Sequence, residues 1–269
     1  ERGRHFCQND AHLFVTPEQI KDEFTKVVRL IFDTYKDFGI TNYRCVLSLR
    51  DPENKEKYHD DDEMWNTAED ALRDVMNSIG IEYTEEIGEA AFYGPKLDVN
   101  VQPAIGNEIT LSTCQLDFCL PAKFNLYYID SNGEKKTPVV LHRAILGSLD
   151  RFMAYILEET KGNLPTWLAP VQVKLLPVAD RHLDYVYEIK KALDACGMRV
   201  EVDSRSEKIG YKIREAQLEK VPYMFIIGDK DVEANTVSVR HRKEGDLGAM
   251  KLEDFIAMAQ KEISTKEIK

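Results

Sequence analysis

Apolar residues recur every three or four positions after residue 19, a spacing typical of a helix that packs one face against a core. These positions are Ile20, Phe24, Val27, Ile31 and Tyr35. Thr16 and Gln19 flank Pro17 with the residue types and spacing of a capping box, and Gly39 follows the stripe as a stop signal. The pattern therefore predicts an amphipathic helix that begins after Thr16 and ends near Gly39.

Segments rich in strand-forming residues follow this helix, joined mostly by short polar turns. They are Tyr43–Leu49, Leu97–Gln102, Ile109–Leu120, Phe124–Ile129 and Thr137–His142, with a hairpin turn at Ser131-Asn132-Gly133 between the last two. Helices are predicted from about Thr67 to Gly80 and from Ala144 to Thr160. This succession favours a mostly antiparallel sheet with helices packed on it, rather than a parallel doubly wound sheet.

An acidic stretch, Asp51–Glu63, lies between the first strand and the second helix and contains Asp60-Asp61-Asp62. Three adjacent carboxylates have the chemistry of a metal-binding cluster, but charge runs of this kind are mostly solvated. We interpret the stretch as a solvated loop.

The order of elements changes after Gly162, Pro165 and Pro170, which interrupt the chain at the best candidate for a domain boundary. Strands are predicted at 173–178, 199–203, 223–227 and 236–240, and helices at 181–195, 209–220 and 252–263. This order is typical of a compact α/β domain of about 100 residues with a mixed sheet. We therefore place one domain at residues 1–168 and a second at 169–269.

Composition and the first residues bear on the location of the protein and on its processing. No apolar run in the 269 residues approaches the roughly 18 residues that cross a bilayer, so no membrane segment is predicted. The five cysteines form no CxxC pair, which favours reduced thiols and a cytoplasmic location. The first residues have neither an initiator Met nor an apolar signal core, which indicates a chain cut from a longer protein.

The formal net charge of -11 is unevenly distributed along the chain. Residues 171–269 hold 18 Lys and Arg against 18 Asp and Glu, so the acidic excess of 18 against 29 lies in the first 170 residues. The balanced second half is therefore compatible with RNA binding, although neutrality alone does not indicate it.

Three short segments combine polar groups that suit a binding site. Gln8, Asp10 and His12 occupy alternate positions, so on a strand their side chains face one way, as they also do on a solvent-exposed strand face. His142 ends a predicted apolar strand, and by itself it fits a hydrogen-bonded core histidine better than a metal ligand. Tyr93-Gly94-Pro95-Lys96 combines a hydroxyl, a tight turn and a cation, which suits a binding site. The same four residues are also compatible with an ordinary surface turn.

Together these segments resemble the catalytic domain of the threonyl-tRNA synthetases. The resemblance is carried by His12, Tyr93-Gly94-Pro95-Lys96, Gln115-Leu116-Asp117-Phe118 and His142-Arg143-Ala144-Ile145-Leu146-Gly147-Ser148. Trp167-Leu168-Ala169-Pro170 resembles that family's linker into its anticodon-binding domain, and Gly228-Asp229-Lys230 lies within that domain. The resemblance covers essentially all 269 residues.

The resemblance implies an α+β class II catalytic domain, with an antiparallel sheet flanked by helices, followed by an α/β anticodon-binding domain with a mixed sheet. It further implies that threonine is activated by ATP to threonyl-adenylate and transferred to the 3′-terminal ribose of tRNA(Thr). Neither step needs a protein nucleophile, so catalysis depends on positioning and on stabilising charge at the α-phosphate with arginines and Mg²⁺.

A zinc ion selects threonine in this family, and His12 and His142 match its two histidine ligands. A Lewis acid that needs a hydroxyl rejects valine strongly, whereas an apolar pocket separates valine from threonine poorly. The third ligand is a cysteine, which the resemblance places upstream of Glu1 together with the first signature motif. Neither Cys7 nor Cys114 is assigned as that ligand.

Further site residues follow from the same matching. Gln8, Asp10 and Tyr93 would surround threonine. Those expected to contact ATP are Arg2, Gln115 and Arg151, and the residues expected to act in catalysis are Arg2, Arg151 and Lys96.

In the second domain, the residues that match anticodon-reading positions are Arg214, Lys220, Asp231 and Arg240. Lys220, Asp231 and Ser206 stand where the family more often has Arg, Glu and Asn, and each of these charges is also compatible with an ordinary surface position.

Two functional hypotheses remain open. The chain is either part of a threonine–tRNA ligase, which alone is expected to be inactive because upstream motifs are missing, or a catalytically inactive tRNA-binding or regulatory module. The family forms homodimers largely through its first signature motif, which is expected upstream of this chain.

Overall fold

The computed structural model describes residues 4–268, which divide into two compact units after Glu158. The boundary predicted at residue 168 lies in the connecting segment that precedes the first strand of the second unit. None of the helices in residues 4–268 combines the length and the apolar character needed to cross a membrane.

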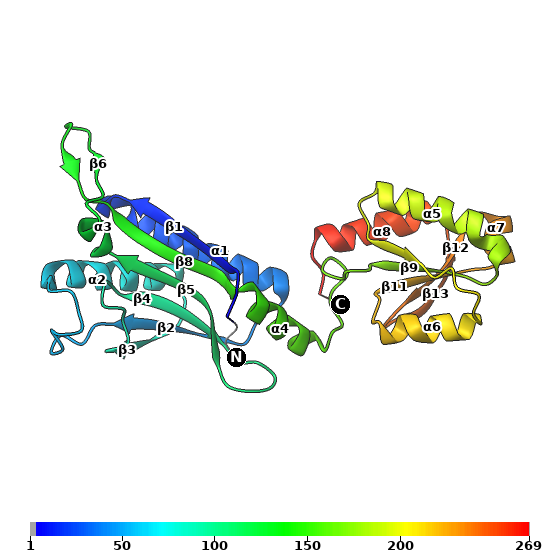
Figure 1. Ribbon diagram of the computed structural model, residues 1–269, viewed down its shortest axis with the longest axis horizontal. Coiled ribbons are helices and arrows are strands. Elements are labelled where there is room, and N and C mark those ends of the chain that lie inside the picture. Colours follow the sequence, from blue (N-terminus) through cyan, green and yellow to red (C-terminus); the bar gives the residue numbers. More distant parts are fainter. Residues whose placement is uncertain (1–3, 269) are drawn as a thin grey trace. The chain divides into compact units, whose positions relative to one another are not determined.

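The first unit is built on a six-stranded sheet in the order β1-β8-β5-β4-β2-β3 (Figure 1). Its strands are β1 (Gln8–Val15), β2 (Tyr43–Leu49), β3 (Tyr83–Ile87), β4 (Lys96–Val101), β5 (Ile109–Asp117) and β8 (Val139–Ser148). Every neighbouring pair is antiparallel except β2 and β3, which run parallel. The predicted antiparallel character of the sheet is therefore confirmed.

Two long helices lie along one face of this sheet (Figure 1). They are α1 (Ile20–Phe38), which follows the short helix η1 (Pro17–Gln19), and α2 (Asp62–Ile79). The apolar stripe of α1 is buried as predicted, and the Tyr35 hydroxyl lies 2.7 Å from Ser112 Oγ on β5. Leu97, Leu116 and Leu141 are fully buried on three successive strands. This face of the sheet is the core of the unit.

Several boundaries in the first unit differ from the sequence prediction. The helix expected from Ala144 begins at Leu149 as α4 (Leu149–Thr160), because β8 continues to Ser148. Strand β8 pairs with β1 on one side and β5 on the other, and these long-range hydrogen bonds override the local helical pattern. Helix α2 begins about five residues earlier than predicted, since Asp61 accepts a hydrogen bond from Met64 N at 3.0 Å as its cap.

The hairpin predicted at Ser131-Asn132-Gly133 is present and projects from the sheet (Figure 1). It joins β6 (Tyr128–Ile129), which is shorter than the strand predicted at Phe124–Ile129, to the unpredicted β7 (Lys135–Lys136). The strand predicted at Thr137–His142 belongs instead to β8. The helix α3 (Leu120–Lys123) occupies the end of the segment predicted as a strand to Leu120. Strand β3 was not predicted because its sequence lacks an apolar run, and its pairing with β2 forms it.

The second unit contains a five-stranded sheet, which is mixed as predicted but has one strand more than the four predicted. Its order is β10-β9-β11-β12-β13, in which the first three strands are parallel and the last two antiparallel. The strands are β9 (Val173–Pro177), β10 (Val200–Val202), β11 (Tyr223–Ile227), β12 (Val237–His241) and β13 (Gly245–Met250). The glycine-containing β13 was not predicted, because its strand conformation comes from pairing with β12.

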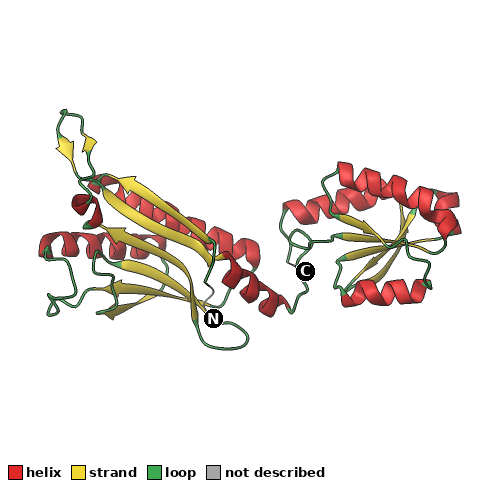
Figure 2. Ribbon diagram, in the orientation of Figure 1, coloured by secondary structure: helices red, strands yellow, loops and turns green. Residues whose placement is uncertain are grey.

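Helices cover both faces of this second sheet (Figure 2). Helices α5 (Leu183–Ala195), preceded by η2 (Asp180–His182), and α8 (Leu252–Ser264) pack on the face that includes Leu175 and Phe225. Helix α6 (Ile209–Leu218) packs on the opposite face against Leu176 and Met224. The short helix α7 (Asp229–Ala234) was not predicted.

Candidate functional site

A row of polar side chains crosses the first sheet on a single face. The strand register pairs His12 with His142, His142 with Gln115, and Gln115 with Lys96. Directly paired residues on neighbouring strands point to the same face. Four of the predicted site residues, from β1, β8, β5 and β4, are therefore neighbours in space.

The row lies on the face opposite the core. The leucines that alternate with it, at 97, 116 and 141, are completely buried, whereas His12 is exposed. The side chains of His142 and Lys96 each retain 23% exposure. Period-two alternation along each strand thus places apolar side chains under the helices and polar side chains where a substrate can reach them.

The two histidines lie in direct contact. Their ring centroids are 4.7 Å apart and the rings are nearly perpendicular, at 84°. Imidazoles at this separation fit two ligands of one metal ion, and imidazole nitrogen suits zinc. No group of three or more His, Cys, Asp or Glu able to hold a metal occurs within residues 4–268. The described residues thus place two histidines side by side but contain no complete set of metal ligands.

The buried cysteine on β5 does not complete that set. Cys114 pairs with Arg143 and alternates with Gln115, so it points to the helix-covered face. Complete burial raises the pKa of its thiol far above the ordinary value, which disfavours the thiolate that a metal requires.

Asp117 lies behind His142; it belongs to the motif Gln115-Leu116-Asp117-Phe118, but no role was predicted for it. It is the last residue of β5 and is fully buried, and its Oδ2 is 2.8 Å from His142 Nε2. The signal in the sequence was its position two residues after Gln115, which places it on the same face of β5.

Tyr93 is held beside the row by a turn that only glycine permits. Its hydroxyl donates a hydrogen bond of 2.5 Å to Gln115 Oε1, and its ring centroid is 5.7 Å from that of His142. A Cβ at Gly94 would lie 1.8 Å from the Leu116 carbonyl oxygen. Burial, followed by the nearby Asp117 charge, raises the pKa of Tyr93, so its hydroxyl stays protonated at neutral pH.

The remaining predicted residues of the first unit lie on β1, β4 and α4, apart from one outside the described residues. Asp10 and Gln8 continue along β1 as exposed residues, with an irregularity in pairing between them. Lys96 Nζ is 2.6 Å from Asp98 Oδ2. Arg151 is an exposed residue of α4, and Arg2 lies outside the described residues.

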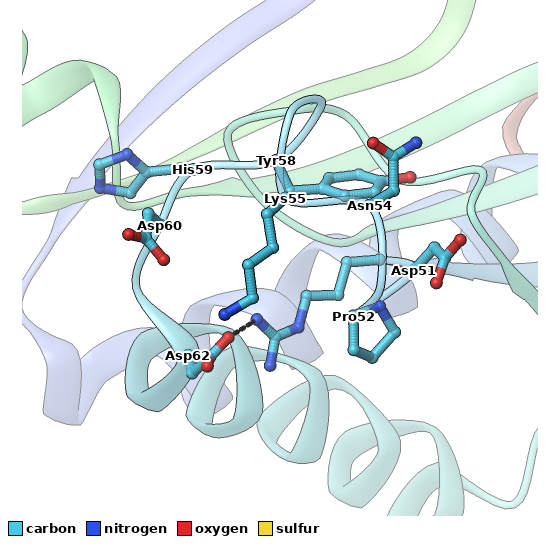
Figure 3. Close-up of a pocket in the computed structure, with 9 residues that line it drawn as sticks. Asp51, Pro52, Asn54, Lys55, Tyr58, His59, Asp60 and Asp62 are labelled. Carbon is cyan, nitrogen blue, oxygen red and sulfur yellow. Dashed lines mark hydrogen bonds and ion pairs between the residues drawn. The ribbon is translucent and has the colours of Figure 1, made fainter.

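The acidic stretch does not form a second site. A cavity of only about 10 Å³ lies among the residues at 50–62, which is room for about one water molecule (Figure 3). Asp62 forms an ion pair with Arg50, and Asp61 caps α2. His59 N donates to Phe92 O at 3.0 Å, so this segment supports the turn that carries Tyr93. The loop interpretation holds except at its end, where Asp62 and Glu63 belong to α2.

In the second unit, two predicted arginines are associated with the face covered by α6. Arg240 pairs with Met224, which packs against α6, and Arg214 is an exposed residue of α6 itself. A cavity of about 370 Å³ lies near the carboxyl ends of β9 and β10, and Ser206 lines it together with Arg205 and Lys208. Such strand ends are the usual ligand-binding edge of an open α/β sheet.

Two other predicted residues of this unit form hydrogen bonds within the fold. Asp231 is 5% exposed, and its carboxylate accepts hydrogen bonds from Gly228 N at 3.0 Å and from Ser238 Oγ at 2.7 Å. Lys220 has a positive φ of 59° and donates from its ammonium to the Lys161 carbonyl. These contacts give both side chains a structural role, whether or not they also contact RNA.

Comparison with known families identifies both units. Residues 1–160 match the tRNA synthetase class II core domain (G, H, P, S and T), and residues 172–262 match the anticodon binding domain. The chain belongs to the class II aminoacyl-tRNA synthetases. The fold predicted for it, a class II core followed by an anticodon-binding domain, is confirmed.

Individual class II synthetases sharpen this assignment. The chain is 55% identical over 264 residues to a threonine–tRNA ligase of Geobacillus sp. (strain WCH70), covering 98% of this chain and 41% of that protein. It is 54% identical over 260 residues to threonine–tRNA ligase 1 of Bacillus subtilis (strain 168), covering 96% of this chain and 40% of that protein. The chain thus spans about two fifths of the length of these relatives.

A solved class II structure agrees with them. The RNA binding domain of threonyl-tRNA synthetase from Cryptosporidium parvum Iowa II superimposes with a TM-score of 0.88 at 35% identity, covering 97% of this chain and 64% of that one. The resemblance to threonyl-tRNA synthetases that the motifs indicated is therefore confirmed.

Proposed function

We propose that this chain is part of a threonine–tRNA ligase whose first unit activates threonine with ATP and whose second unit binds the anticodon of tRNA(Thr). The observation that carries the proposal is the polar row His12, His142, Gln115 and Lys96, which the strand register assembles on the face away from the core. The 55% identity to a threonine–tRNA ligase supports threonine as the amino acid.

His12 and His142 would hold a zinc ion, with a third protein ligand from outside residues 4–268. When bound, the ion supplies a Lewis acid for the amino group and hydroxyl of threonine. The ring centroids of His12 and His142 are 4.7 Å apart, which supports a shared metal ion. His142 also contacts the buried Asp117. A site that needs a hydroxyl rejects valine by far more than the 10- to 200-fold typical of a missing methylene.

The neighbouring side chains would bind the rest of the substrates. Gln8, Asp10 and Tyr93 would surround threonine, since the first two precede His12 at alternate positions of β1 and the Tyr93 hydroxyl stays protonated beside His142. Gln115 and Lys96 would contact ATP and the reacting carboxyl or phosphate, together with Mg²⁺ and with Arg2 and Arg151. Such contacts accelerate adenylate formation by positioning and by stabilising charge at the α-phosphate.

The second unit would bind the anticodon of tRNA(Thr) through Arg214, Lys220, Asp231 and Arg240. The balance of charges in residues 171–269 is compatible with this role. A homodimeric parent protein in the cytoplasm belongs to the same proposal.

Threonine-dependent exchange of pyrophosphate into ATP tests the proposal, measured on this chain and on a longer parent loaded with zinc. We expect His142→Ala to lower exchange by more than the roughly 10- to 100-fold typical of changing a residue behind a metal ligand. Binding of tRNA(Thr) should change little. The control is His59→Gln, which removes an imidazole from the loop outside the row.

The alternative is a tRNA-binding module without adenylate chemistry. It is favoured by the incomplete set of metal ligands within the described part of the chain. A zinc-loaded parent that binds tRNA(Thr) but shows no threonine-dependent exchange would establish this alternative.

A further inference from the structure

Asp117 is fully buried, and both oxygens of its carboxylate form hydrogen bonds. Oδ1 accepts the backbone N–H groups of Cys119, at 2.9 Å, and Leu120, at 2.8 Å, at the turn into α3. Oδ2 lies 2.8 Å from His142 Nε2. A buried carboxylate with three partners is held rigidly, because losing any of these partners would leave a polar group unsatisfied.

These contacts decide which nitrogen of His142 carries the proton. A backbone N–H can only donate, so Oδ1 acts as an acceptor for both amides. An ionised carboxylate also accepts at Oδ2, so Nε2 must be the protonated nitrogen of the neutral ring. The unprotonated Nδ1 is then the nitrogen left for a ligand, beside the His12 ring at 4.7 Å between centroids.

We propose that Asp117 is a positioning residue that fixes His142 in the tautomer with the proton on Nε2, so that Nδ1 is available to a divalent metal ion. Metal-binding histidines commonly donate their other ring N–H to a carboxylate, which fixes the ring and increases its basicity as a ligand. The identity of the metal depends on the proposed function, but the tautomer does not.

The substitution Asp117→Asn keeps the volume of the side chain but replaces an acceptor facing His142 with a donor. In the variant, the carboxamide oxygen stays with the two backbone N–H groups of the turn, which directs the side-chain NH₂ toward His142. Two donors cannot face each other, so the ring proton moves from Nε2 to Nδ1 and blocks the nitrogen that binds the metal. The same logic explains why a carboxylate-to-amide change behind a catalytic histidine produces the wrong tautomer.

The first experiment measures the tautomer of His142 by long-range nitrogen–proton NMR on the intact chain labelled with ¹⁵N-histidine, with His142→Gln identifying the resonance. We expect the proton on Nε2 in the wild type and on Nδ1 in Asp117→Asn. The wild-type tautomer is measured independently of Asp117→Asn, so it decides the matter even where that variant fails to fold. A proton on Nδ1 in the wild type would overturn the proposal.

The second experiment measures the affinity of the same chain for Zn²⁺ by competition with a chromophoric chelator. We expect Asp117→Asn to weaken binding by about 10- to 100-fold. The matched control, Asp98→Asn, changes another carboxylate on the same face, one that contacts Lys96 and not His142, and should bind Zn²⁺ like the wild type. Wild-type affinity in Asp117→Asn would overturn the proposal.

The two proposals fail separately. If His142→Ala leaves Zn²⁺ affinity unchanged, the metal assignment in the proposed function is wrong, while the wild-type tautomer still decides the role of Asp117. If the tautomer is as expected and only Asp117→Asn and His142→Ala lose affinity, both proposals stand.

Discussion

The two sheets of this chain differ in how many of their faces are covered by helices. The first has α1 and α2 on one face and a row of polar residues on the other, where His12 is exposed. The second has helices on both faces, and polar residues such as Asp231 and Glu262 are buried in its fold. A sheet with one open face can assemble a site across its strands, whereas a sheet covered on both faces must bind through strand ends, edges and loops.

The largest expected effect in the second unit comes from Glu262 on α8. It accepts hydrogen bonds from Thr166 Oγ1 at 2.5 Å and from the Tyr223 hydroxyl at 2.6 Å, all within buried side chains. Glu262→Ala leaves both hydroxyls unsatisfied, so we expect the free energy of unfolding of this unit to fall by about 3 kcal/mol.

Hydrogen exchange of the backbone amides, followed by mass spectrometry, checks this expectation. Protection should fall by roughly 100-fold in β9 and β11 and remain unchanged in β5 and β8 of the first unit. The exposed Gln260→Ala on the same helix is the control. Equal losses in both units would contradict the separation drawn between the two sheets.

Arg240 is expected to act on RNA and not on the chemistry of the first unit. Arg240→Ala should weaken binding of tRNA(Thr) by about 10-fold, within the range of 1 to 3 kcal/mol for a specific contact, and leave adenylate formation unchanged. Filter binding at fixed salt is the measurement, because such affinities depend strongly on salt. Lys243→Ala removes a charge from the neighbouring turn as the control, and equal losses in binding and exchange would exclude an anticodon role.

The smallest expected effect comes from Asp231, whose carboxylate binds the start of α7 and Ser238. Asp231→Ala should lower the free energy of unfolding of the second unit by about 1 kcal/mol, the usual value of a helix cap. Denaturant unfolding measures the change, with the exposed Glu233→Ala as the control. Loss of tRNA binding without loss of stability would favour a direct RNA contact instead.

Much of the architecture followed from local sequence patterns. The apolar stripe after residue 19 specified α1, because a period of three to four residues describes one helix face wherever the helix packs. The change from strand-rich to alternating elements specified an antiparallel sheet followed by a mixed one. The motifs around His12, Tyr93 and His142 identified the family before any contact was known.

Other features depended on contacts between distant segments. Strand β8 extends to Ser148, which pairs with Gln8 of β1, although its own residues resemble the start of a helix. Similarly, the roles of Asp117 and Asp231 appear only where their carboxylates meet donors from other segments or turns.

The amino-acid sequence alone determined which residue types occur and with what local period, and so the elements and the list of candidates. Only the tertiary structure decided that His12, His142, Gln115 and Lys96 form one row. The physical reason is that side-chain alternation is a property of one strand, whereas register is set by hydrogen bonds and packing between strands far apart in the chain.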